Sequence, residues 1–167
     1  MKNVYITTVL GPDRPDILKS LAIVTRGWGG EWLTSKVMKI DGQFTAMMKV
    51  TIEQEVEGKL KAELEEKFKD LTFIYTEAES GKEQPLETIN LVVECKDRSG
   101  LTKDINSIIS AHDLQVDRMD FDRYEVSGIG VAVFCAKLAI SVAEGTDKEA
   151  IAAYFEEMPD DVRVNLV

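Results

Sequence analysis

The sequence predicts an α+β fold made of two consecutive βαββαβ units, each with an antiparallel sheet. An internal repeat is the first observation: a shift of 84 residues superimposes three charged residues of each copy, Asp13, Arg14 and Lys19 on Asp97, Arg98 and Lys103. The second observation is that strand-like and helix-like hydrophobic patterns follow in the same order in both halves. The third is a stretch rich in Gly, Pro and charge between the halves, which predicts domains at residues 1–79 and 86–167 with a linker at 80–85.

The first unit opens with the run NVYITTVL, which is short and rich in β-branched residues, as strands are. A helix is predicted next from apolar residues spaced at i, i+4 and i+7, namely Ile17, Leu21 and Val24. Two strand-like runs follow at residues 31–40 and 43–52, and the Asp41-Gly42 pair between them predicts a type I′ hairpin. A second helix and the closing strand TFIYTEA complete the unit, the helix being marked by Leu60, Leu64 and Phe68.

The second unit repeats this order. The strand TINLVVEC leads into a helix with apolar residues at Leu101, Ile105 and Ile108. Two strands at residues 114–125 and 130–141 are joined by the looser turn VSGI. The last helix is predicted to begin with a capping box of Thr146 and Glu149, and the strand VRVNLV closes the unit.

The charge balance limits the possible partners. The net charge is −10, and residues 84–167 hold 8 basic against 16 acidic side chains. Binding nucleic acid requires Lys and Arg to replace the counterions of the phosphates, so direct DNA binding is not expected. Because no run of eighteen apolar residues and no export signal is found, we expect a cytoplasmic protein with no membrane contact.

Neither the cysteines nor the histidine suggests a reactive centre. Cys95 and Cys135 each lie inside an apolar strand-like run without CxxC spacing, which predicts buried thiols. The single histidine, His112, is predicted at the end of a helix. We therefore expect no metal site and no cofactor.

The chain resembles a known family in the segments VLGPDRPDILKSLA, GGEWLTSKVMKIDGQFTAMMKV and CKDRSGLTKDINSIISAHDLQV. With the tandem βαββαβ order, these segments resemble tandem ACT domains, whose units are ferredoxin-like, and most closely the glycine cleavage system transcriptional repressor group. The resemblance covers nearly the whole chain. It implies a small-molecule sensor for an amino acid that regulates a transcription factor or a metabolic enzyme by contact, and the name of the group suggests glycine as the ligand. It implies no catalysis.

The same loops are the sites that elementary chemistry favours. The first turn of a helix offers unpaired N–H groups to a carboxylate, and a nearby aspartate can accept hydrogen bonds from an ammonium group. The family reads G-x-D-R-P-G-I at the first loop, whereas this sequence has Asp16 in place of the glycine, and Gly100 keeps the pattern in the second. A glycine permits close approach of a ligand to the backbone. The second loop is therefore the preferred predicted site, with Asp97, Arg98, Ser99, Gly100 and Leu101.

The first loop supplies further candidates, Gly11, Asp13 and Arg14. Gly30 and Glu31 in the first copy, and Leu114 and Gln115 in the second, begin strands that we expect beside the loops. The alternative is that Asp13 and Asp97 cap their helices and bind nothing.

Two other functions are compatible with the sequence. The chain could be an adaptor whose loops bind no ligand, or an acylphosphatase-like hydrolase that cradles phosphate with Arg14. The second is disfavoured because Asp13 and Asp16 flank Arg14 and repel a phosphate. The uncovered sheet faces of such units also favour a homodimer.

Overall fold

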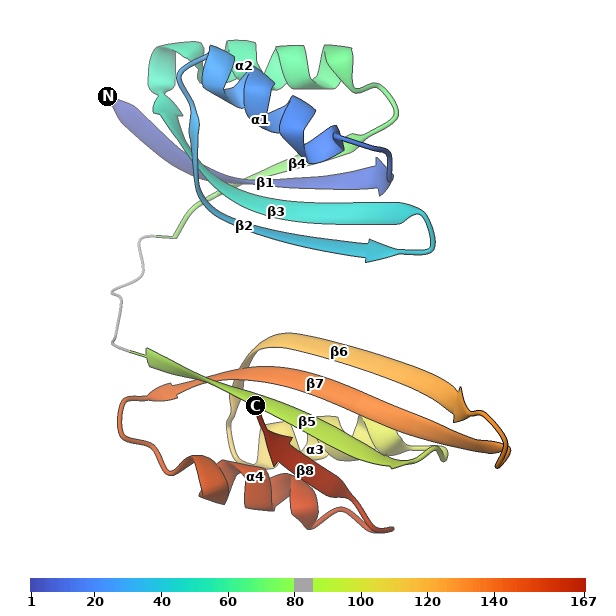
Figure 1. Cartoon of the computed structure of the whole chain (residues 1–167). Helices are drawn as coiled ribbons and strands as arrows, with labels where there is room; N and C mark the ends of the chain where they lie inside the picture. The colour runs from blue at the N-terminus through green and yellow to red at the C-terminus, as the bar shows by residue number, and fades with distance from the viewer. Residues whose placement is uncertain (80–85) are drawn as a thin grey trace. The chain divides into compact units, whose positions relative to one another are not determined.

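The fold was analysed in a computed structural model of the chain, which describes residues 1–79 and 86–167 (Figure 1). The chain divides into two compact units, one on each side of the predicted linker. The linker prediction at 80–85 falls outside the described residues, so the domain boundaries stay a prediction.

The βαββαβ order predicted for both units is confirmed. The first unit comprises β1 (Lys2–Pro12), α1 (Ile17–Gly27), β2 (Glu31–Ile40), β3 (Gln43–Glu53), α2 (Gln54–Lys67) and β4 (Thr72–Glu77). The second comprises β5 (Leu86–Lys96), α3 (Leu101–Ala111), β6 (Gln115–Val126), β7 (Val131–Ala143), α4 (Lys148–Glu156) and β8 (Arg163–Leu166). Asp41 and Gly42 both have positive φ, 45° and 77°, as the predicted type I′ hairpin requires.

Each unit is one four-stranded antiparallel sheet with both helices on one face (Figure 1). The strand orders are β2-β3-β1-β4 and β6-β7-β5-β8. Because β1 and β2 both pair antiparallel with β3, they run in the same direction, and α1 carries the chain back between them. The loop after β1 therefore lies at one end of the sheet and the start of β2 lies at the other.

The predicted capping box of α4 is wrong by one residue. Asp147 is the N-cap, and its carboxylate accepts hydrogen bonds from the amides of Glu149 and Ala150 at 3.1 and 3.3 Å. Thr146 instead donates its hydroxyl to the Ala143 carbonyl at 2.6 Å. The threonine closes the turn after β7, which leaves the next residue to begin the helix.

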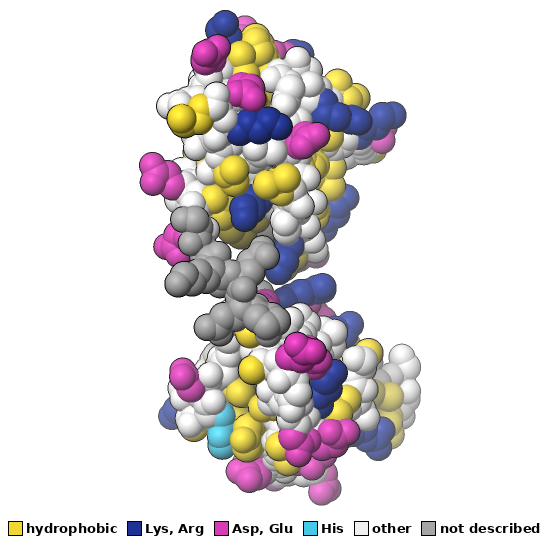
Figure 2. Space-filling view, turned by 90° about the vertical axis from the view of Figure 1, so that its left-hand side faces the viewer, with side chains coloured by type: hydrophobic (Ala, Val, Ile, Leu, Met, Phe, Trp, Pro, Cys, Tyr) yellow, Lys and Arg dark blue, Asp and Glu magenta, His cyan; other side chains and the backbone are white. Residues whose placement is uncertain are grey.

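The face of each sheet away from the helices differs between the units. On the first sheet this open face carries exposed apolar side chains, Leu10, Met38, Ile40, Met47 and Ile74. On the second sheet the equivalent face is mostly polar, with Asn90, Arg118, Asp120 and Lys137. In the view of Figure 2, acidic and basic side chains are interspersed on both units, and the described residues form no continuous basic area on that side.

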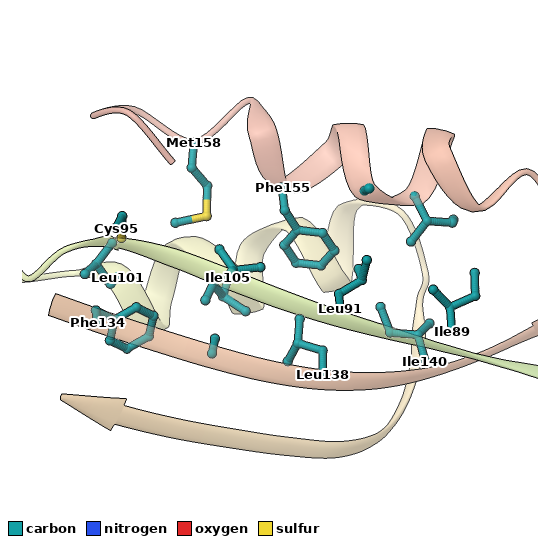
Figure 3. Packing of buried hydrophobic residues seen from close by; sticks show 14 of the residues in the cluster. Ile89, Leu91, Cys95, Leu101, Ile105, Phe134, Leu138, Ile140, Phe155 and Met158 are labelled. Carbon is teal, nitrogen blue, oxygen red and sulfur yellow. The ribbon is translucent and has the colours of Figure 1, made fainter. Parts of the chain in front are cut away.

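Each unit has a core of its own between sheet and helices. In the second unit, Phe155 of α4 points into a cluster with Leu91 of β5 and Ile105 of α3 (Figure 3). All three side chains are at most 1% exposed. In the first unit the corresponding cluster joins Leu21 and Leu60 of the helices to the sheet. Because each cluster is complete within its unit, each unit has the apolar burial that an independent fold requires.

Candidate functional site

The loop between β1 and α1 is held by two ion pairs. The Asp13 carboxylate lies 3.1 Å from the Lys39 ammonium at the end of β2. The Arg14 guanidinium donates two hydrogen bonds to the carboxylate of Asp70, at 2.6 and 3.0 Å, in the turn between α2 and β4. The loop is thus fastened to two neighbouring segments of its own unit.

The loop between β5 and α3 is held by ion pairs at the equivalent positions. Arg123 of β6 donates its Nε–H to Asp97 at 3.0 Å. Arg98 donates to Asp104 at 2.7 Å, and its Nε lies 3.0 Å from the Asp160 carboxylate without forming a hydrogen bond. Arg123 is the residue 84 positions after Lys39. Asp160 lies in the turn between α4 and β8, as Asp70 lies in the turn between α2 and β4.

These contacts explain why the Asp-Arg pair occurs in both loops. Each aspartate binds the end of an edge strand, and each arginine binds the turn after the second helix. The alternative that Asp13 and Asp97 cap their helices does not hold, because the N-cap residues of α1 and α3 are Asp16 and Gly100 and neither helix start has a side-chain cap. All five ion pairs are partly exposed, and exposed pairs of this kind contribute little to stability.

Asp16 and Gly100 give the two loops the same backbone turn. Both adopt the left-handed conformation, with φ of 59° and 87°, immediately before the helix. Helix α3 therefore begins at Leu101, because a left-handed residue cannot be part of a right-handed helix. The replacement of glycine by Asp16 keeps the shape of the first loop and adds a carboxylate to it.

An open depression lies on the first loop, lined by residues 13–19 and by Lys39. It contains the carboxylates of Asp13 and Asp16 and the ammonium groups of Lys19 and Lys39. The Ile17 amide donates to the Arg14 carbonyl at 3.3 Å, and the next amides of the first turn have no partner within the helix, as at any helix start. The depression therefore offers both signs of charge, which an α-amino acid requires.

The structure brings together most of the residues predicted for the second loop, with one exception. Asp97, Arg98, Ser99 and Gly100 form one turn, and an added Cβ at Gly100 would meet only Arg98 Nη1 at 3.8 Å, so its backbone is accessible. Leu101 is fully buried in the core, so it cannot touch a ligand at the surface.

Gly11 has a packing reason of its own. A Cβ there would come within 2.6 Å of the Leu71 side chain and 2.9 Å of the Asp70 carbonyl. The glycine lets β1 approach the turn that Arg14 binds.

Gly30, Glu31, Leu114 and Gln115 do not lie beside the loops of their own units, contrary to expectation. Glu31 aligns through Thr51 with Val4, near the start of β1, whereas the loop follows Pro12 at its end. Gly30 and Leu114 close the preceding helices, donating to the carbonyls of Thr25 and Ile109 at 2.9 and 3.0 Å. The helix returns the chain before the next strand starts, and this separates the two segments.

Sequence reasoning missed the four partners of the loops, Lys39, Arg123, Asp70 and Asp160. The first two could have been found, because the shift of 84 residues places one cation on the other. The two aspartates are 90 residues apart, because the second hairpin is six residues longer than the first. A single shift therefore does not superimpose them.

Reactive groups elsewhere are few in the described parts of the chain. Cys95 and Cys135 are free and buried as predicted, and burial raises the pKa of both thiols, which disfavours the nucleophilic thiolate. His112 is the C-cap of α3 as predicted, and its ring stacks on Tyr154 with centroids 3.6 Å apart. The described residues contain no cluster of metal-ligating side chains. None of their helices is long and apolar enough to cross a membrane.

Comparisons with known proteins agree with this architecture. The ACT domain family model matches residues 3–76. The chain is similar to the solved structure of an unknown protein from Galdieria sulphuraria, with a TM-score of 0.81 and 15% identity over 100% of this chain and 99% of that one. It is similar to a protein provisionally assigned as a glycine cleavage system transcriptional repressor, with a TM-score of 0.75 and 16% identity over 100% and 98% of the two chains. A search of curated proteins finds no match.

The two sheets, each covered by two helices on one face, define a tandem ferredoxin-like protein. Residues 3–76 match the ACT domain family model, and the second unit repeats the topology of the first. The two similar structures share this fold.

Proposed function

We propose that this protein is an amino-acid-sensing regulator that controls a transcription factor or a metabolic enzyme by direct contact. The observation that carries the proposal is that the unit matched as an ACT domain has a depression with both signs of charge at its β1–α1 loop. The similar structure assigned as a glycine cleavage repressor supports transcription regulation as the output and glycine as a ligand to test. The protein itself is proposed to catalyse no reaction.

The proposed ligand position uses the helix start and the charges beside it. The carboxylate of the amino acid accepts hydrogen bonds from the first amides of α1 and is attracted by Lys19 and Lys39. Its ammonium group binds Asp13 or Asp16. The equivalent loop of the second unit, with Asp97 and the accessible backbone of Gly100, is the alternative position.

A thermal-shift screen of the twenty amino acids tests the proposal. At one hundred times its Kd, a ligand should stabilise the protein by about 2.7 kcal/mol. Asp13→Asn should weaken binding at the first loop at least tenfold, because a charge-assisted hydrogen bond is worth about 1.5 to 3 kcal/mol. Asp97→Asn is the matched variant for the second loop, and whichever variant loses affinity in calorimetry identifies the position. Both should fold normally, since each loses only a partly exposed ion pair.

The alternatives give different results in the same screen. An adaptor without a ligand site would be stabilised by no amino acid. A hydrolase that cradles phosphate would be stabilised by inorganic phosphate, but Arg14 is already engaged by Asp70 and the flanking carboxylates repel that anion.

We further propose that the protein is a cytoplasmic homodimer that does not itself bind DNA. The exposed apolar side chains on the open face of the first sheet support self-association, because their burial would be favourable. The acidic net charge of −10 disfavours contact with nucleic acid. Light scattering across the micromolar range tests the oligomeric state, and a monomer mass at every concentration would contradict the dimer.

A further inference from the structure

A second depression lies on the first unit, at the end of α1 and the start of β2. It is lined by Ala22, Thr25, Arg26, Gly30, Glu31 and Trp32. The strand register places it at the end of the sheet opposite to the β1–α1 loop. It is therefore a separate place on the unit and shares no residue with the depression described above.

Two charged side chains of opposite sign line this depression. Arg26 and Glu31 are both exposed, and neither forms an ion pair with any residue in the described part of the chain. In the loops, by contrast, Asp13, Arg14 and their counterparts are paired within the unit. Trp32 is half-buried against the core and forms an apolar wall beside the two charges.

The second unit serves as an internal control for what the fold itself requires. Both units close the helix in the same way, through the Gly30 and Leu114 amides. The positions equivalent to Arg26, Glu31 and Trp32 are nevertheless occupied by Ser110, Gln115 and Val116. The backbone closure therefore needs neither the opposite charges nor the indole, and these three side chains need another explanation.

We propose that this depression binds an α-amino acid with an apolar or aromatic side chain. Arg26 binds the carboxylate, for which its planar guanidinium is suited. Glu31 receives the ammonium group, and the ligand side chain packs against the indole of Trp32. The choice of an amino acid as ligand rests on the proposed sensing function. The position of this second site is argued from its own lining residues and not from the residues of the β1–α1 or β5–α3 loop.

Tryptophan fluorescence of the full chain provides the test, because the protein has only two tryptophans. Trp28→Phe leaves Trp32 as the reporter, with circular dichroism as the check that losing the Trp28 hydrogen bond to Glu63 does not unfold the unit. L-phenylalanine and L-leucine should change the emission of this variant saturably. N-acetyl-L-phenylalanine amide, which lacks both charges, should not.

Charge-removing variants then locate the site. Arg26→Gln and Glu31→Gln should each weaken binding of L-phenylalanine at least tenfold, measured by calorimetry in chains that keep both tryptophans. Ser110→Ala, at the equivalent of Arg26 in the second unit, is the matched control and should have no effect.

The outcomes separate this inference from the proposed function. If Asp13→Asn or Asp97→Asn abolishes amino-acid binding while Arg26→Gln and Glu31→Gln do not, the protein is a sensor that uses a loop and this inference is overturned. If no amino acid binds, both are overturned. If L-phenylalanine binding depends on Arg26 and Glu31 but not on the loop aspartates, this inference stands.

Discussion

Replacing Phe155 by alanine should destabilise the second unit by about 3–5 kcal/mol. The ring is 0% exposed and packs between α4 and the sheet against Leu91 and Ile105 (Figure 3). Its removal forfeits the transfer free energy of the ring and leaves a cavity that the surrounding strands fill only in part. Because the first unit has a separate core, we expect its amides to keep their hydrogen-exchange protection.

Hydrogen exchange resolved by segment measures this effect, with β1 and β3 reporting on one unit and β5 and β7 on the other. Ile129→Ala is the control, because that side chain is 70% exposed and its loss should change stability by less than about 0.5 kcal/mol. Equal losses of protection in both units would contradict the expectation that each unit is stabilised by its own core.

Substitutions at Asp16 and Gly100, the residues that precede α1 and α3, should change the stability of the protein in opposite directions. Gly100→Ala places a Cβ on a left-handed residue with φ of 87° and should cost about 1–2 kcal/mol. Asp16→Gly relieves the same conformation at φ of 59° and should stabilise the first unit by up to about 1 kcal/mol, since the greater freedom of glycine in the unfolded chain offsets part of the gain.

Urea unfolding of the two variants measures both changes. Gly58→Ala is a useful control, because Gly58 lies within α2 with open space around it, so alanine should stabilise that helix by about 1 kcal/mol. A destabilised Asp16→Gly chain would show that the Asp16 side chain makes a contribution larger than its backbone strain.

The predictable part of the fold lies in local patterns. The βαββαβ order, the type I′ turn and the buried cysteines follow from hydrophobic period, turn chemistry and flanking composition, which act over a few residues. The capping residue of α4 was misplaced because Thr146 and Asp147 are both good N-caps. Only the turn made by the threonine hydroxyl decides between them.

The candidate sites were predicted in part. The repeated Asp-Arg pair correctly marked two equivalent loops, but their ion pairs join residues as far apart as Arg14 and Asp70, and no local pattern reveals such contacts. The placement of Glu31 beside the loop failed because it requires the direction of β2, which strand pairing fixes. That Arg26 and Glu31 form no ion pair within the described residues can be seen only in the folded structure, where the other ion pairs are known.

By itself the sequence determined the duplication, the order of strands and helices, and the acidic surface, since these depend on composition and on periods of two and 3.6 residues. Only the tertiary structure decided which charges neutralise one another, that Leu101 is buried, and that the two ends of the first sheet carry separate depressions. The physical reason is that pairing and burial depend on distances between segments far apart in the chain. Those distances exist only after the helices return across the sheet and the strands pair.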